Sequence, residues 1–219
     1  MTTAAQHAAA PAIEAVLFDL TGVVTGSPWA AIGGIGDGAG MAPDAVLEFM
    51  LGPYDQDTDH PFHQLERGEI ELMTYVADVQ ARAVDAGIEL DFERLRTLMS
   101  DLPVHDEMVA RIRALRADGY RTGLITNNVR EAGDQWRTKV PLDELFDVVV
   151  DSSAVGMRKP NPAIFHLALD RLGVADPAAA VFLDDHPGNV AGARAAGLHA
   201  LLVDDIDEAL AALDALLDQ

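Results

Sequence analysis

Runs of apolar residues that end in polar side chains recur along this chain and predict the strands of a sheet. Ala15 to Phe18 is apolar without a break and runs directly into Asp19. An uninterrupted run of this kind is typical of a strand buried on both faces of a parallel sheet. Further strands are expected at 121–125, 146–150, 181–185 and 200–203.

Helical segments separate most of these strands. Apolar residues follow helical spacing at 108–117, 162–172 and 206–217, and Gly119 and Gly173 lie where the first two of these helices should end. Strands that alternate with helices predict an α/β fold with right-handed crossovers and a parallel sheet.

The stretch 43–101 has a different pattern, because almost nothing in it alternates as in a strand. Its apolar residues recur at helical spacing, and one predicted face consists of Ile70, Met73, Val76, Ala77 and Val84. We expect a small group of helices inserted after the first strand. Residues 25–40 are too rich in glycine for a well-formed helix, so we expect a loop there, either a hinge that closes over a crevice or a flexible connector.

These patterns divide the 219 residues into three parts. Residues 1–12 are expected to form a flexible tail, residues 13–25 and 103–219 the α/β core, and residues 26–102 the helical insert. A chain of this length can bury a full core and still carry the smaller inserted domain.

Composition indicates an ordinary globular protein, with 49% hydrophobic and 23% charged residues. The absence of cysteine excludes disulfides, thiol nucleophiles and zinc-thiolate sites, and it fits a reducing compartment. The first twelve residues contain no Lys or Arg, and no segment approaches the roughly 18 consecutive apolar residues of a membrane helix. We therefore expect a cytoplasmic protein.

The formal net charge of −21 opposes binding to nucleic acid or to an anionic membrane surface, because no basic patch exists to displace counterions. Only two lysines occur, Lys139 and Lys159. An anionic substrate needs positive potential from a metal ion, a few cationic side chains or helix N-termini. The sequence does not fix the oligomeric state.

Polar residues at the ends of the predicted strands form a candidate site. Asp19 ends the first strand, Thr126-Asn127-Asn128 the second and Asp184-Asp185 the fourth, and Lys159 lies just before the helix that starts at Asn161-Pro162. The carboxyl ends of parallel strands meet at one crevice. Two adjacent carboxylates repel each other unless a cation lies between them and a third acid, and Asp19 is the natural third.

Each of these signals also has a plain alternative: a turn acid, an Asn-rich turn or a solvated loop lysine. His60 and His63 have the spacing of a metal pair, but Pro61 intervenes and no third ligand is in view, so we expect surface or capping histidines. The residues that could face the crevice at the strand ends are Trp29, Tyr54, His60 and His63.

Four segments resemble, in this order, the motifs of the haloacid dehalogenase-like hydrolase superfamily. They are Phe18-Asp19-Leu20-Thr21-Gly22-Val23-Val24, Ile125-Thr126-Asn127-Asn128, Arg158-Lys159-Pro160-Asn161-Pro162, and Phe182-Leu183-Asp184-Asp185 with Asn189 and Gly192. The helical insert resembles the α-helical cap of the superfamily's first subgroup. The chain is similar over residues 13–205 to phosphatases such as the N-terminal domain of soluble epoxide hydrolase and to bacterial sugar-phosphate phosphatases.

This resemblance implies a Rossmann-like parallel sheet core with an inserted α-helical cap, and a Mg²⁺-dependent phosphatase that acts on a small phosphorylated metabolite. In such an enzyme Asp19 is the nucleophile and a Mg²⁺ ligand. Thr21 supplies a backbone carbonyl to the metal, and Asp185 is the direct acidic ligand with Asp184 beside it.

The resemblance also implies how the phosphoryl group is held. Thr126 and the Asn127 amide would bind its oxygens, and Lys159 would neutralise charge on the nucleophile and on the transferred group. In-line attack by Asp19 would then give an aspartyl phosphate.

Position 21 departs from the family pattern, which usually has an acid/base Asp there. A threonine hydroxyl does not titrate near neutral pH, and losing general acid–base help typically costs about 10²–10⁴ in rate. We expect slow turnover, another group in the role, or a leaving group that needs no protonation. The alternative is a phosphoryl transferase or a non-catalytic phosphate-binding regulatory module.

Two other functions fit less well. The Asp184-Asp185 pair disfavours dehalogenation, which has no use for a divalent cation. A response-regulator receiver also uses a strand-end acid cluster, but the acid pair comes late in this chain and a helical insert intervenes.

Overall fold

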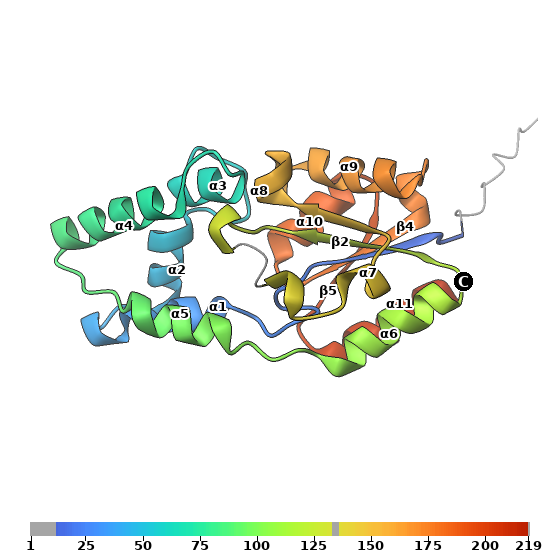
Figure 1. Ribbon diagram of the computed structural model, residues 1–219, viewed down its shortest axis with the longest axis horizontal. Helices are drawn as coiled ribbons and strands as arrows, with labels where there is room; N and C mark the ends of the chain where they lie inside the picture. The colour runs from blue at the N-terminus through green and yellow to red at the C-terminus, as the bar shows by residue number, and fades with distance from the viewer. Residues whose placement is uncertain (1–11, 133–135, 219) are drawn as a thin grey trace, which may run out of the picture.

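A computed structural model describes residues 12–132 and 136–218 of the chain (Figure 1). The described residues contain a sheet of parallel strands in the order β3-β2-β1-β4-β5. The strands are β1 (Ala15–Phe18), β2 (Arg121–Thr126), β3 (Val148–Asp151), β4 (Ala180–Asp184) and β5 (His199–Leu202). The predicted α/β fold with a Rossmann-like parallel sheet is confirmed, with strand boundaries shifted by one or two residues.

The central strand β1 is fully buried because helices cover both faces of the sheet. Val16 and Phe18 pack into one apolar cluster with α6 (Asp106–Ala117) and α11 (Ile206–Leu217). Ala15 and Leu17 point the other way, into a cluster with α9 (Pro162–Leu172) and α10 (Pro187–Ala195). Figure 1 shows the strands between α9 and α10 on one side and α6 and α11 on the other.

Short helices complete the core at its edges. They are η2 (Arg130–Ala132), η3 (Trp136–Thr138), α7 (Leu142–Leu145), α8 (Ser152–Val155) and η4 (Pro177–Ala179). Helix α9 begins and ends as the sequence predicted. The Asn161 side chain accepts a hydrogen bond from the Ala163 backbone N–H, and Gly173 ends the helix with φ 72°.

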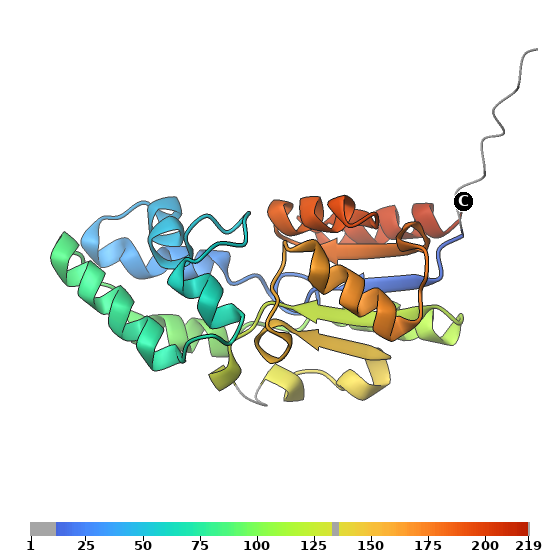
Figure 2. The same cartoon turned by 90° about the horizontal axis from the view of Figure 1, so that it is seen from above.

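A group of helices lies beyond the carboxyl ends of the strands, toward which the arrows in Figures 1 and 2 point. It comprises α1 (Trp29–Gly33), η1 (Gly34–Ala39), α2 (Pro43–Leu51), α3 (Pro61–Glu66), α4 (Leu72–Ala86) and α5 (Phe92–Ser100). These helices share an apolar cluster of their own, which includes Ile32, Met50, Leu65 and Val79. We refer to α1–α5 with η1 as the helical group.

Two expectations about this region were wrong. The glycine-rich stretch contains α1 and η1 instead of a loop, and Ile32 and Ile35 in it are buried. Two of its glycines allow close packing: a Cβ at Gly33 would lie 2.9 Å from the Pro43 Cβ, and one at Gly36 would collide with Val46.

The buried face of α4 also differs from the predicted one. Tyr75, Val79 and Ala83 are its buried residues, whereas Met73 is 70% and Val84 78% exposed. The buried face of α4 therefore lies on a different side of the helix from the predicted face.

The predicted tail at 1–12 lies outside the described residues, apart from Ala12. Among the residues that the structure describes, no helix is both long enough and apolar enough to cross a membrane.

Candidate active site

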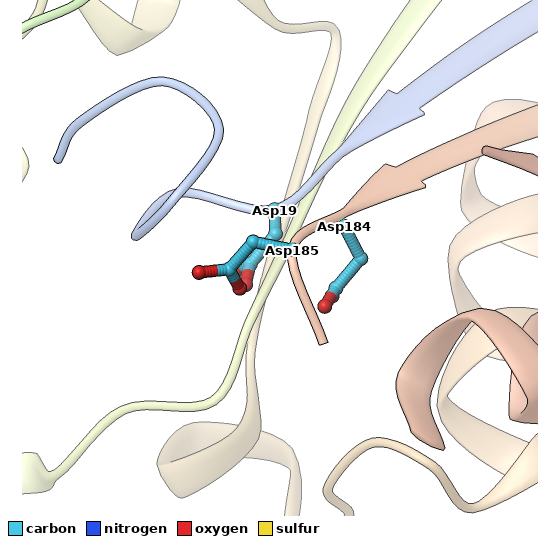
Figure 3. A group of neighbouring side chains, drawn as sticks. All are labelled: Asp19, Asp184 and Asp185. Carbon is cyan, nitrogen blue, oxygen red and sulfur yellow. The ribbon is translucent and has the colours of Figure 1, made fainter. Parts of the chain in front are cut away.

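Three carboxylates from two neighbouring strands meet at the carboxyl edge of the sheet (Figure 3). Asp19 follows β1 directly, and Asp184 is the last residue of β4. Because Phe18 pairs with Leu183, both acids reach the edge at the same level. Asp185 follows, and one oxygen of each carboxylate lies within 4.8 Å of the others. Acids far apart in the sequence are thus brought together.

The Lys159 ammonium lies between two of these acids. Its Nζ donates to Asp184 Oδ2 at 2.7 Å and lies 2.8 Å from Asp19 Oδ1, and the residue is fully buried. Burial alone lowers the pKa of Lys159, but the charges of Asp184 and Asp19 outweigh it and raise that pKa above its usual value. Lys159 therefore stays protonated in the site.

One ammonium does not balance three carboxylates. Burial, followed by the repulsion of Asp184 and Asp185, raises the pKa of Asp19 well above its usual range, although Lys159 opposes the shift. Burial and the charge of Asp184 likewise raise the pKa of Asp185 to about 6. The cluster therefore has an excess of negative charge, which favours an additional cation.

Thr126 and Asn127 lie at the end of the adjacent strand β2. Thr126 is 1% exposed, and its Oγ1 has no hydrogen-bond partner among the described residues. The Asn127 side chain contacts the Lys159 backbone: Oδ1 accepts from Lys159 N at 2.8 Å and Nδ2 donates to Lys159 O at 3.0 Å. Asn127 thus fixes the segment that carries the lysine, while the Thr126 hydroxyl is left without a protein partner.

Thr21 begins a tight turn that follows Asp19. It is partly exposed and forms a bridge with Thr25, and Gly22 N donates to Thr25 O at 2.7 Å. Gly22 has φ 92°, and a Cβ there would collide with the Asp185 carboxylate. Only glycine at position 22 therefore allows this turn to lie against the acid cluster.

Side chains that were not predicted to contact the acids hold Asp184, the last residue of β4, and Asp185, which follows it. Ser27 Oγ and Trp29 Nε1 donate to Asp185 Oδ2 at 2.9 and 2.8 Å. Asn189 Nδ2 donates to both oxygens of Asp184, at 3.0 and 3.2 Å. Asn189 belongs to the fourth motif, but no pattern pairs Ser27 or Trp29 with an acid so far along the chain.

A buried ion pair links the helical group to the segment that carries Lys159. Arg158 Nε donates to Glu66 Oε2 at 2.6 Å, and the two side chains are 0% and 3% exposed. Arg158 Nη1 also donates to the Gln56 carbonyl at 2.6 Å, and its guanidinium lies 4.7 Å from the centre of the Tyr54 ring. The Tyr54 hydroxyl in turn donates to Glu66 Oε1 at 2.8 Å.

The two candidate histidines differ in their surroundings. His60 caps α3, since its Nδ1 accepts from Phe62 N at 3.2 Å, as expected for a capping residue. His63 is fully buried, so the expectation of a surface position was wrong for it, and burial lowers its pKa to about 4. Its Nδ1 accepts from Thr58 N at 3.1 Å. Neither belongs to the acidic cluster of Figure 3, which is the group with metal-ligand spacing among the described residues.

A cavity of about 420 Å³ opens beside Asp185, between that acid and the helical group. It is lined by Trp29, Leu47, Glu48, Leu51, Gly52, Pro53, Tyr54, Asp185, His186 and Pro187. Of the four residues expected to face a crevice, Trp29 and Tyr54 line this cavity, and His60 and His63 do not.

The sequence pattern of the haloacid dehalogenase-like hydrolase family matches residues 13–197, which include all the site residues described above. This chain belongs to that family. The match confirms the resemblance of its strand-end motifs.

Mouse relatives of this haloacid dehalogenase-like hydrolase are longer than it is. Acyl-CoA dehydrogenase family member 10 is 30% identical over 221 residues, which cover 96% of this chain and 20% of the relative. Bifunctional epoxide hydrolase 2 is 29% identical over 220 residues, or 93% of this chain and 38% of the relative. The chain thus spans well under half the length of either protein.

A shorter match and a solved structure support the same family. A phosphoserine phosphatase of Thermus thermophilus is 35% identical over 102 residues, 47% of this chain and 41% of the relative. A structure described as a predicted HAD-like family hydrolase from Porphyromonas gingivalis is 26% identical, with a TM-score of 0.67 over 95% of this chain and 100% of that one.

Proposed function

We propose that this haloacid dehalogenase-like hydrolase is a Mg²⁺-dependent phosphatase that hydrolyses a small phosphomonoester through a phosphoryl group carried on Asp19. The observation that carries the proposal is the cluster of Asp19, Asp184 and Asp185 facing the Lys159 ammonium. The unpartnered Thr126 hydroxyl beside it supports an oxyanion ligand, because a buried hydroxyl without a partner is costly.

The donor set fits magnesium. All three acids offer carboxylate oxygens, which Mg²⁺ prefers, and the cluster has negative charge to spare. Both Asp184 oxygens already accept hydrogen bonds, from Lys159, Asn189 and the His186 backbone, so Asp184 orients Lys159 and would support a bound ion without ligating it directly. Asp19, Asp185 and the Thr21 carbonyl would hold the ion, which when bound would polarise the phosphoryl oxygens.

The residues of the chain then have distinct tasks. A carboxylate oxygen of Asp19 attacks phosphorus as the bond from phosphorus to the ester oxygen breaks. Lys159 and the Thr126 hydroxyl stabilise the charge on the phosphoryl oxygens, and the Asn127 amide adds a donor. Water then attacks the phosphorus of the aspartyl phosphate and releases inorganic phosphate and free Asp19. The helical group acts as a cap that selects the substrate.

Proton transfer is the step that limits turnover in this mechanism. Thr21 has no titratable group that protonates the leaving oxygen or activates the water, so turnover is slow unless the leaving group is stable as an anion. The same residue favours the second candidate, in which Asp19 passes its phosphoryl group to another acceptor or the site binds phosphate as a regulatory module.

Hydrolysis of p-nitrophenyl phosphate tests the proposal. We expect activity with Mg²⁺ that disappears with EDTA and in Asp19→Asn. Asp44→Asn makes the same change at an exposed acid of α2 and should keep full activity. Activity that survives in Asp19→Asn would exclude Asp19 as the nucleophile.

A further inference from the structure

The wall of the cavity beside Asp185 is built from three aromatic rings. The ring centres of Trp29 and Tyr54 are 5.1 Å apart, those of Tyr54 and His186 5.0 Å, and those of Trp29 and His186 5.3 Å. The first two pairs have edge-to-face angles of 71° and 87°. Rings in contact at these angles support one another and form a firm apolar surface.

Three of the four polar atoms of these rings are already used by the protein. Trp29 Nε1 donates to Asp185, and the Tyr54 hydroxyl donates to Glu66. His186 Nδ1 accepts from the Gly188 backbone N–H at 3.2 Å. Ring carbons and the single polar atom His186 Nε2 therefore remain for contact with a bound molecule, and Leu47, Leu51 and Pro53 extend the apolar lining.

The charges of the lining are all negative. Glu48 and Asp185 are its carboxylates, and no lysine or arginine is among the lining residues. A leaving group with a carboxylate or a second phosphate would meet the like charge of Glu48 here, without a lysine or arginine to pair with. A polyol would lose water from its hydroxyls and find few partners in return.

We propose that this pocket binds the leaving group of the substrate and selects phosphomonoesters whose leaving group is uncharged and apolar, with a flat aromatic ring as the preferred occupant. The inference rests on the proposed function, because it takes the phosphoryl group to lie between Lys159 and Thr126. The chain should then reject substrates that carry a second anionic group.

Phosphonates test this without the influence of leaving-group chemistry, since they bind but are not hydrolysed. We would measure inhibition of p-nitrophenyl phosphate hydrolysis by benzylphosphonate, 2-hydroxyethylphosphonate and phosphonoacetate, with Mg²⁺ and the full chain. Benzylphosphonate should bind at least tenfold more tightly than the other two. Equal or tighter binding of phosphonoacetate would overturn the inference.

A charge reversal at the pocket provides a second readout. Glu48 is exposed on α2, so Glu48→Lys should fold normally and tighten phosphonoacetate at least fivefold, with benzylphosphonate little changed. Glu89→Lys makes the same change at an exposed residue outside the lining and should leave the ranking as it is. A change of ranking in both variants would show a general charge effect and contradict the pocket assignment.

Failure of this inference is distinguishable from failure of the proposed function. If hydrolysis depends on Asp19 but phosphonoacetate binds more tightly than benzylphosphonate, the phosphatase assignment stands and the pocket proposal is wrong. If no hydrolysis occurs, calorimetric titration with the same three phosphonates still measures the ranking, and benzylphosphonate must still bind most tightly.

Discussion

Glu66→Gln should destabilise the protein strongly, because it removes one partner of a buried ion pair. The substitution keeps the size of the side chain and an oxygen that accepts a hydrogen bond. It removes the charge that faces Arg158, whose side chain is 0% exposed. The guanidinium would then be buried without an acid 2.6 Å away.

The expected loss is large in relation to total stability. Removing one partner of a buried ion pair costs about 3–5 kcal/mol, against a typical folding free energy of about 5–15 kcal/mol. For a chain of this size, that loss corresponds to a fall in Tm of roughly 6–20 °C. Because Glu66 belongs to α3 and Arg158 precedes Lys159, the contact between the helical group and the core should loosen as well.

Urea unfolding followed by circular dichroism measures the loss, and an exposed pair provides the control. Arg96 and Glu93 form an ion pair with side chains 74% and 83% exposed, so Glu93→Gln should cost at most about 1 kcal/mol. Adding Arg158→Met to Glu66→Gln should recover part of the stability, because the unpaired charge is then gone. A loss in Glu66→Gln no larger than in Glu93→Gln would show that the buried pair is no more important for stability than the exposed pair.

Three further predictions concern the site. Asp185 has a pKa raised to about 6, so the metal-free protein should lose stability as pH rises from 5 to 7 and the carboxylate ionises. Thermal melts in EDTA check this, and Asp185→Asn should reduce the dependence and leave the part that is due to Asp19. Added Mg²⁺ should raise the melting temperature more at pH 7 than at pH 5, since proton and metal compete for Asp185; an equal rise at both would contradict metal binding there. Thr21→Asp should raise turnover of benzyl phosphate by about 10²-fold, as measured by phosphate release, and a fall would show that Thr21 has another role.

The sequence was sufficient to predict the residues at the strand ends, because their position depends on one simple rule. Parallel strands end at the same edge of a sheet, so Asp19, Thr126 and Asp184 meet once their strands are recognised as apolar runs. The same rule gave the approximate place of Lys159, in the loop before a capped helix.

The contacts from the helical group were not predictable in this way. Trp29 reaches Asp185, and Glu66 reaches Arg158, through the packing of one part of the chain on another, which leaves no periodic signal. Glycine content was misleading at residues 25–40 because Gly33 and Gly36 permit a close approach to α2 there. On α4, an apolar stripe through Met73 was mistaken for the buried face, while Tyr75 and Val79 on another side made the contacts.

Mass spectrometry of the acid-quenched enzyme determines whether Asp19 carries the phosphoryl group. After brief mixing with p-nitrophenyl phosphate and Mg²⁺, the peptide that contains Asp19 should gain the mass of one phosphoryl group. Thr21 should make this species accumulate, since it supplies no base for its hydrolysis. Active protein in which that peptide is never modified, or in which the added mass is found on another residue, would contradict the account.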